Sequence, residues 1–144
     1  MKHLWSIICE RSSIDYESNN LSLFNCLEQL QVTIDKSKQK DGEQLIIPLA
    51  FQLFSLWELE NETMIELTIE VVDPDGSIIN SLEAPFPIKG SFKRFRSRIN
   101  IPGLPITISG RYLMRLKRKL QDNEFKVEAE LPIEISVNFK DKIS

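Results

Sequence analysis

Three arginines at alternate positions, Arg94, Arg96 and Arg98, have the residue type and spacing in this sequence that best suit a binding role. In a β-strand, side chains two residues apart share a face and lie roughly 7 Å from one another. Each guanidinium is a planar, permanent cation that can hold a carboxylate or phosphate through two parallel hydrogen bonds. The stripe therefore predicts one of two arrangements. Either it forms structural ion pairs with Glu66 and Glu70 on a neighbouring strand, or it binds phosphate, a lipid headgroup or an acidic protein partner.

Residues suited to acid–base, nucleophilic or metal chemistry are scarce. The single histidine, His3, stands at a terminus of a kind that often frays, and no Cys and His residues have metal-ligand spacing. The five glycines form neither a dinucleotide-binding nor a phosphate-binding loop pattern. We therefore expect no enzyme, no cofactor and no metal. Hydrolysis by a pair of carboxylates in a cleft is a third, weaker hypothesis, because no pair stands out.

Two other groups of residues could react or bind, but their context favours structural roles. Cys9 and Cys26 have apolar neighbours, which predicts buried thiols in a reducing compartment, with a regulatory disulfide as the alternative. Residues 73–76 (Asp-Pro-Asp-Gly) could offer two carboxylates to Ca²⁺. Their composition is typical of a tight turn.

Charge is segregated along the chain. Residues 41–88 contain ten acidic side chains and no Lys or Arg, whereas residues 89–119 contain ten basic side chains and no Asp or Glu. Residues 120–134 contain five carboxylates against one lysine. Such blocks predict ion pairs between neighbouring strands. The net charge of −3 gives no reason to expect nucleic acid or an anionic membrane.

The length of 144 residues suits one domain, which we place at 1–140, with a frayed tail at 141–144. Hydrophobic residues make up 42% of the chain and charged residues 27%, which is typical of a globular domain. The first residues lack the pattern of a signal peptide, and no apolar run approaches the roughly 20 residues of a membrane span. These observations predict a cytoplasmic protein.

A period of two dominates the hydrophobic pattern and predicts β-strands at 63–71 and 125–137. The residues expected to face the core are Ile65, Leu67, Ile69 and Val71 in the first strand, and Phe125, Val127, Ala129, Leu131, Ile133, Ile135 and Val137 in the second. Further strands are expected at 45–59, where Pro48 could interrupt the pairing, and at 92–101 and 111–120. Turns are expected at 73–76, at Pro85 and Pro87, at 102–103 and at 121–124.

One hairpin can be predicted to the level of register. If residues 111–120 and 125–137 pair around Asp122 and Asn123, one register satisfies both faces of the sheet. The expected outer pairs are Lys117–Glu128, Arg115–Glu130 and Arg111–Glu134, and the expected inner pairs are Tyr112–Ile133, Met114–Leu131, Leu116–Ala129 and Leu120–Phe125.

The segment 21–34 fits two descriptions, a strand with a bulge or a short helix near residues 20–30, and the all-β context favours the strand. The chain as a whole predicts an all-β fold, an antiparallel two-sheet β-sandwich of 7–8 strands with immunoglobulin-like or C2-like character. A closed barrel is the alternative.

The run from Leu4 to Val32, the turn at 71–76 and the Gly110-Arg111-Tyr112 step resemble a group of small uncharacterised bacterial proteins. Those proteins are predicted β-sandwiches in which a late strand opens with Gly-x-Tyr. The resemblance implies a bacterial, cytoplasmic sandwich, and it brings no activity and no site residues with it.

The sequence favours a non-enzymatic interaction or assembly module that binds a protein partner, or its own copy as a homodimer, through a sheet face or edge. The alternative is an anion-binding domain that uses Arg94, Arg96 and Arg98 on phospholipid or nucleic acid. Nucleic acid is the weaker version, because the net charge is negative and only Phe92 and Phe95 accompany the arginines.

Overall fold

The computed structural model describes residues 1–35, 45–47, 50–91, 93–106 and 108–140. Pro48, Phe92 and the expected tail at 141–144 lie outside the described residues. The strands are β1 (Lys2–Ile14), β2 (Leu21–Cys26), β3 (Gln29–Asp35), β4 (Leu45–Ile47), β5 (Phe51–Glu58), β6 (Met64–Val72), β7 (Ile78–Pro87), β8 (Arg94–Ile101), β9 (Leu104–Ile106), β10 (Gly110–Lys119) and β11 (Phe125–Lys140). Within the described part of the chain there is no helix, and hence no helix that could cross a membrane.

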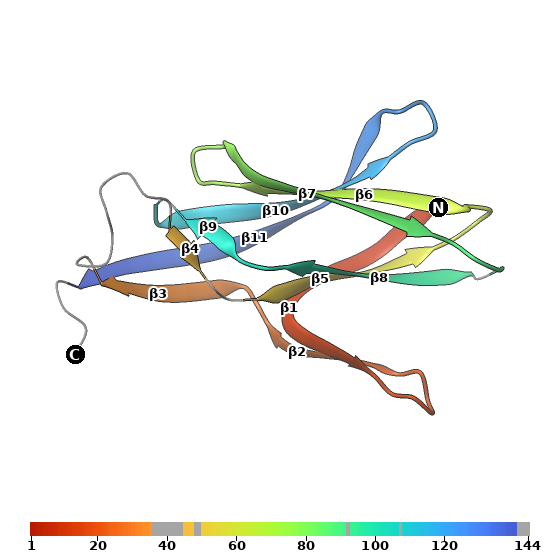
Figure 1. Cartoon of the computed structure of the whole chain (residues 1–144), viewed down its shortest axis with the longest axis horizontal. Coiled ribbons are helices and arrows are strands. Elements are labelled where there is room, and N and C mark those ends of the chain that lie inside the picture. The colour runs from red at the N-terminus through yellow and green to blue at the C-terminus, as the bar shows by residue number, and fades with distance from the viewer. Residues whose placement is uncertain (36–44, 48–49, 92, 107, 141–144) are drawn as a thin grey trace.

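The strands form two main layers around one interior (Figure 1). The four-stranded sheet has the order β2-β1-β5-β8, the five-stranded sheet has the order β3-β11-β10-β6-β7, and β4 pairs with β9 separately. The prediction of an all-β fold with two sheets is confirmed. The strand count was too low, since the described residues form eleven strands rather than seven or eight.

The prediction of antiparallel pairing throughout was wrong at one edge, where β3 runs parallel to β11. The segment 21–34 is neither one bulged strand nor a helix, because it is divided between the two sheets. β2 ends at Cys26 in the four-stranded sheet, and β3 begins at Gln29 in the five-stranded sheet. This change of sheet brings β3 alongside the last strand in the same direction.

The alternation predicted for residues 63–71 is confirmed by β6, whose Ile65, Leu67, Ile69 and Val71 are buried. Both sheets contribute to a single hydrophobic core, so neither sheet buries its apolar face alone. The largest fully buried side chains are Trp57 and Tyr112, and each satisfies its polar atom locally. Trp57 Nε1–H donates to Ser97 Oγ at 2.9 Å. The Tyr112 hydroxyl donates to the Ile108 carbonyl at 2.6 Å.

The predicted β10–β11 hairpin has the expected register from Arg111–Glu134 to Leu116–Ala129. Beyond that point a β-bulge shifts the pairing by one residue, so Lys117 lies opposite Val127 instead of Glu128. For the same reason Lys119, rather than Leu120, lies opposite Phe125.

The bulge also reverses the faces of the residues beyond it, because side chains alternate in a strand. Phe125 and Val127, predicted to face the core, are therefore 50% and 46% exposed. Glu128 points inward instead, and its side chain is only 6% exposed. There it meets Arg118 Nε at 3.0 Å.

Two other expectations about strands and turns were wrong. The segment 45–59 is not one strand, because β4 pairs with β9 whereas β5 lies in the four-stranded sheet. Pro85 and Pro87 do not form a turn but lie within β7, an edge strand. The Ile88 N–H donates to the Thr63 carbonyl at 2.8 Å, so alternation points the nitrogens of both prolines away from the sheet.

The turns expected at 73–76 and 121–124 are confirmed. Asp73 Oδ1 accepts the N–H groups of Asp75 and Ser77, which closes the first turn. Gly76 supplies the positive φ of 87° that this turn requires. Asn123, with φ of 64°, plays the same part at the tip of the β10–β11 hairpin.

Candidate binding groove

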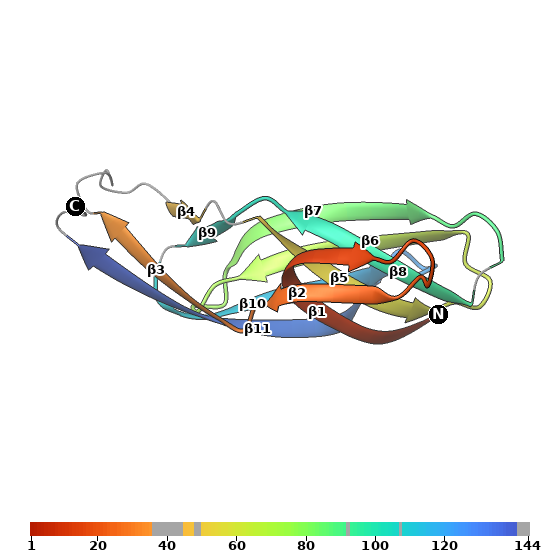
Figure 2. The same cartoon turned by 90° about the horizontal axis from the view of Figure 1, so that it is seen from below.

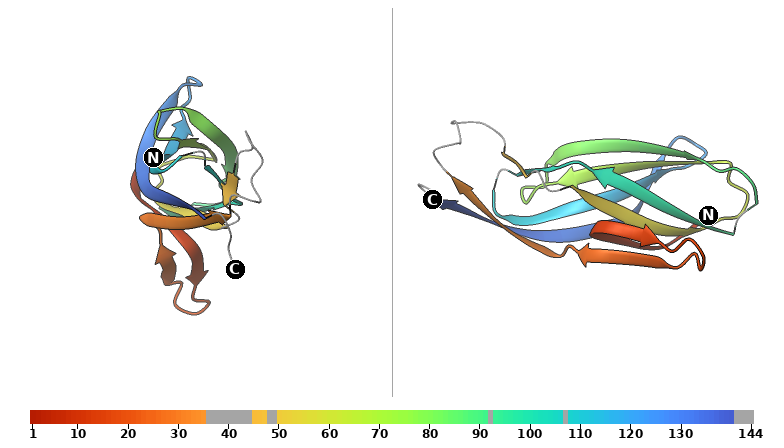
Figure 3. Two further views of the ribbon diagram at one scale, coloured as in Figure 1. Left: turned by 90° about the vertical axis from the view of Figure 1, so that its left-hand side faces the viewer. Right: turned by 60° about the horizontal axis from the view of Figure 1, so that its bottom comes forward.

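The most distinctive surface of the molecule is created where β1 leaves its sheet. β1 pairs with β5 from Lys2 to Cys9, and with β2 from Cys9 to Ile14. Residues 10–25 therefore project as a two-stranded hairpin, which we call the arm. The arm lies below the body of the molecule in Figure 1 and crosses in front of β5 and β8 in Figure 2. The end-on view in the left panel of Figure 3 shows the arm projecting from one side of the two layers.

Between the arm and the outer face of the four-stranded sheet lies a groove of about 710 Å³. The groove is mostly apolar, with arginines along one side. Its lining residues are Trp5, Ile7, Ile14, Asn19, Leu21, Leu23, Leu56, Arg94, Phe95 and Arg96. Ile7 and Ile14 remain 36% and 46% exposed, so the apolar surface is open to a ligand.

The structure places the three sequence-predicted arginines on β8, the edge strand beside this groove. Arg96 has a structural contact, because its Nη2 donates to the Asn19 carbonyl at 3.0 Å and its Nη1 to Asn19 Oδ1 at 3.4 Å. This contact ties the tip of the arm to β8. Arg94 lines the groove, and Arg98 extends the stripe beyond it; both are exposed.

The predicted ion pairs of the stripe with Glu66 and Glu70 are not formed. Both glutamates lie on β6 in the other sheet, where Lys119 is 3.7 Å from Glu66 and Lys117 is 2.6 Å from Glu70. Glu58 lies opposite Arg94 in register. Nevertheless, among the described residues no carboxylate forms an ion pair with any arginine of the stripe. With respect to the carboxylates of the described residues, Arg94 and Arg98 thus keep their hydrogen-bonding capacity for an external anion.

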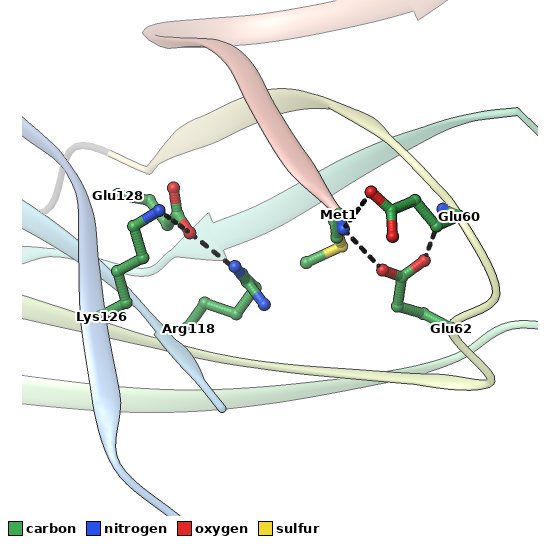
Figure 4. Close-up of polar contacts among 6 residues, drawn as sticks. All are labelled: Met1, Glu60, Glu62, Arg118, Lys126 and Glu128. Carbon is green, nitrogen blue, oxygen red and sulfur yellow. Dashed lines mark hydrogen bonds and ion pairs between the residues drawn. The ribbon is translucent and has the colours of Figure 1, made fainter. Parts of the chain in front are cut away.

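A second hollow, of about 760 Å³, opens at one end of the molecule and is lined by both polar and apolar residues. The Met1 ammonium lies 2.8 Å from Glu62 Oε1 and 3.7 Å from Glu60 Oε1 (Figure 4). Burial raises the pKa of Glu62, but the ammonium and the Glu60 N–H outweigh burial and leave that pKa below its usual range.

Deeper at the same end, Glu128 lies between Arg118 at 3.0 Å and Lys126 at 4.0 Å (Figure 4). The charged groups drawn in Figure 4 are therefore paired with one another. That leaves the arginine-flanked groove, although slightly smaller, as the better candidate for binding an anion.

His3 lies within β1, where its ring meets Trp57 edge-on with centroids 4.9 Å apart. His3 Nε2 lies 2.7 Å from Ser6 Oγ, which lies 2.6 Å from Ser55 Oγ. Burial lowers the pKa of His3, which favours the neutral ring. This chain of polar groups satisfies the two serines where β1 meets β5.

Sequence reasoning missed the arm and the residues that form the groove with it. From the sequence, Trp5 and Leu56 are predicted to lie in strands, and nothing marks them as binding residues. Only the pairing of β1 with two successive partners makes them the floor of a groove. Asn19 gives a weak signal in the sequence, since Asn tolerates the positive φ of 59° that it adopts at the tip of the arm.

Comparison with known proteins adds no functional information. No protein-family model matches the chain, and a search of curated proteins finds no significant similarity.

Proposed function

We propose that this protein is a non-enzymatic interaction module whose groove binds an extended, acidic segment of a protein partner. The observation that carries the proposal is the pair of open guanidiniums, Arg94 and Arg98, beside an apolar groove. Alternate side chains of an extended segment repeat roughly every 7 Å, which is the spacing of the arginines on β8. Of the carboxylates at alternate positions of the segment, those four residues apart would meet Arg94 and Arg98, and its apolar side chains would cover Ile7 and Ile14.

We further propose that the fold is an immunoglobulin-like or C2-like sandwich, and that the protein is bacterial and cytoplasmic. The bond from the Tyr112 hydroxyl to the Ile108 backbone supports the first part, because such a bond recurs at the corners of sandwich folds. The free thiols of Cys9 and Cys26 suit a reducing compartment.

A labelled peptide of alternating Glu and Leu tests the proposal, with a peptide of alternating Lys and Leu as its control. Anisotropy should show saturable binding of the acidic peptide only. Trp5 fluorescence should change with it, because Trp5 lines the groove, while Trp57 is fully buried. The double variant Arg94→Ala/Arg98→Ala should bind at least about tenfold more weakly, since each charge-assisted contact contributes on the order of 1.5–3 kcal/mol.

A matched control variant, Lys89→Ala/Lys140→Ala, removes the same charge from exposed positions that do not line the groove. It should bind the acidic peptide like the wild type. Equal binding by the two double variants would overturn the proposal, because the effect would then be one of net charge alone.

The second candidate function is anion binding to phospholipid or nucleic acid by the same stripe. It is favoured by Arg98, which is open but lies outside the groove lining. Vesicles containing phosphatidylserine, and a single-stranded oligonucleotide, are its probes. Salt-sensitive binding that needs Arg94 and Arg98, without binding of the acidic peptide, would favour this candidate over the first. Light scattering across a salt series tests the homodimer in the same samples.

A further inference from the structure

Cys9 and Cys26 lie directly opposite each other on β1 and β2, at the root of the arm. Cys9 is the residue at which β1 changes partner, because it also pairs with Gln52 on β5. Its side chain is fully buried, whereas Cys26 is exposed. The prediction of two buried thiols is thus correct for Cys9 and wrong for Cys26.

The hydrogen bonds beside this pair decide whether the two sulfurs can meet. The Leu27 N–H donates to the Ile8 carbonyl at 2.8 Å, and these residues flank the cysteines on one side. In an antiparallel ladder that bond makes Cys9 and Cys26 a non-hydrogen-bonded pair, whose Cα atoms lie about 4.5 Å apart. A disulfide spans Cα separations of about 4.4–6.8 Å. The two strands need little rearrangement to form one.

We propose that Cys9 and Cys26 form a reversible redox pair, oxidised to a disulfide by peroxide and reduced again by a cellular dithiol. The Cys26 thiolate attacks one peroxide oxygen, which gives a sulfenic acid and hydroxide. The Cys9 sulfur then attacks the Cys26 sulfur, the S–O bond breaks, and the oxygen leaves as water. In total, two thiols and one hydrogen peroxide give one disulfide and two waters.

The different surroundings of the two cysteines support these separate roles. Cys26 lines a hollow of about 450 Å³ together with Ser6 and Leu27, so a small oxidant can reach it. Burial, and the neighbouring Cys26, raise the pKa of the Cys9 thiol, which makes Cys9 a poor first target for peroxide. Cys9 is suited to the second step, because its partner sulfur is beside it.

The disulfide would restrain the arm at Cys9, the residue at which β1 changes partner. In the reduced protein, backbone hydrogen bonds and side-chain contacts alone hold the arm at its root. A disulfide would join Cys9 on β1 covalently to Cys26 on β2. The amides of residues 11–23 should then open less often. This inference does not depend on what the groove binds.

Peroxide treatment of the full chain, followed by peptide mapping without reductant, tests the proposal. The expected product is a monomer that has lost two hydrogens, with Cys9 and Cys26 in one linked peptide pair and full reversal by dithiothreitol. Amide exchange in residues 11–23 should slow in the oxidised protein and return to its former rate after reduction.

Two variants separate the steps of the reaction. In Cys9→Ala, dimedone should trap a sulfenic acid at Cys26; in Cys26→Ser, Cys9 should stay reduced. If the buried Cys9→Ala substitution prevents folding, peptide mapping of the oxidised wild type still shows whether Cys9 and Cys26 are linked. A dimer linked through Cys26, sulfinic acid at Cys26 beside a reduced Cys9, or no reaction at all would each overturn the proposal.

Discussion

His3 is a histidine whose neutral form the fold favours. Its ring is half-buried against Trp57 and lies within hydrogen-bond distance of Ser6. Burial lowers the pKa of His3 from its usual 6.5, while the carboxylate of Glu128 and the Trp5 backbone partly offset that effect. The folded state therefore binds a proton at His3 less readily than the unfolded state does.

This difference predicts a loss of stability in mild acid. The contribution of the neutral ring is complete above about pH 6.5 and is lost as the pH falls through that value toward the lower pKa of the folded state. The free energy of unfolding in urea, measured at about pH 7.5 and about pH 5.5, should fall more for the wild type than for His3→Gln. Equal falls in the two proteins would show that His3 does not contribute.

Glu70 is the most buried carboxylate on the outer face of the five-stranded sheet, at 8% exposure. Lys117 Nζ lies 2.6 Å from its Oε1, and Arg115 Nη1 lies 3.7 Å away. Glu70→Gln leaves these half-buried cations without their common anion and should cost about 1–3 kcal/mol in urea unfolding. The matched control is Glu66→Gln, whose side chain is 50% exposed and 3.7 Å from Lys119. It should cost less than about 0.5 kcal/mol. Similar losses in the two variants would contradict this account.

At the scale of the elements, Pro74 in the β6–β7 turn packs against Gly110 at the start of β10. A Cβ at Gly110 would lie 2.7 Å from Pro74 Cγ, and the backbone there has φ of +145°. Gly76, in the same turn as Pro74, also has a positive φ, but a Cβ there would meet nothing within 4 Å. The turn and the strand can therefore approach each other only where the side chain is a hydrogen.

The two glycines separate backbone strain from steric overlap. Gly76→Ala should cost about 1 kcal/mol, because only the positive φ disfavours alanine. Gly110→Ala should cost about 2–4 kcal/mol, since overlap with Pro74 adds to the strain. Urea unfolding of both variants measures the difference, and equal costs would mean that the turn moves aside freely.

The β10–β11 hairpin shows how far the sequence can predict an element. Period-two alternation and opposite charges determine the register from Arg111 to Leu116, because both faces must match at once. The bulge at Glu128 escapes this reasoning, since the alternation of apolar residues continues through Val127 and Phe125. One signal was present. Arg118 lies two residues after the core residue Leu116, so its side chain should face the core as well. A charged side chain facing inward needs a partner of opposite charge.

The groove could not be predicted from the sequence, because it depends on β1 having two successive partners. Local pattern indicates that residues 2–14 are a strand. It does not show that pairing with β5 ends at Cys9, the point from which the arm departs. The arginine stripe was identified from its spacing alone. That Arg96 would hold Asn19, while Arg94 stays open, follows only from the position of the arm.

At the scale of the whole molecule, a single core joins the two sheets. Trp57 in the four-stranded sheet and Met114 in the five-stranded sheet are both fully buried in that core. β3 and β11 pair although they lie near opposite ends of the described chain. Neither sheet can keep its inner face covered if the other unfolds, so the two should lose structure together.

We therefore expect one cooperative unfolding transition in urea. In a Trp5→Phe background, fluorescence reports Trp57 alone, and far-UV circular dichroism reports both sheets; the two midpoints should coincide. Met114→Ala should remove about 2–5 kcal/mol. It should lower the Trp57 midpoint as much as the dichroism midpoint, although Met114 and Trp57 belong to different sheets. A fluorescence midpoint that did not move would mean that the four-stranded sheet folds on its own, and the single-domain description would then fail.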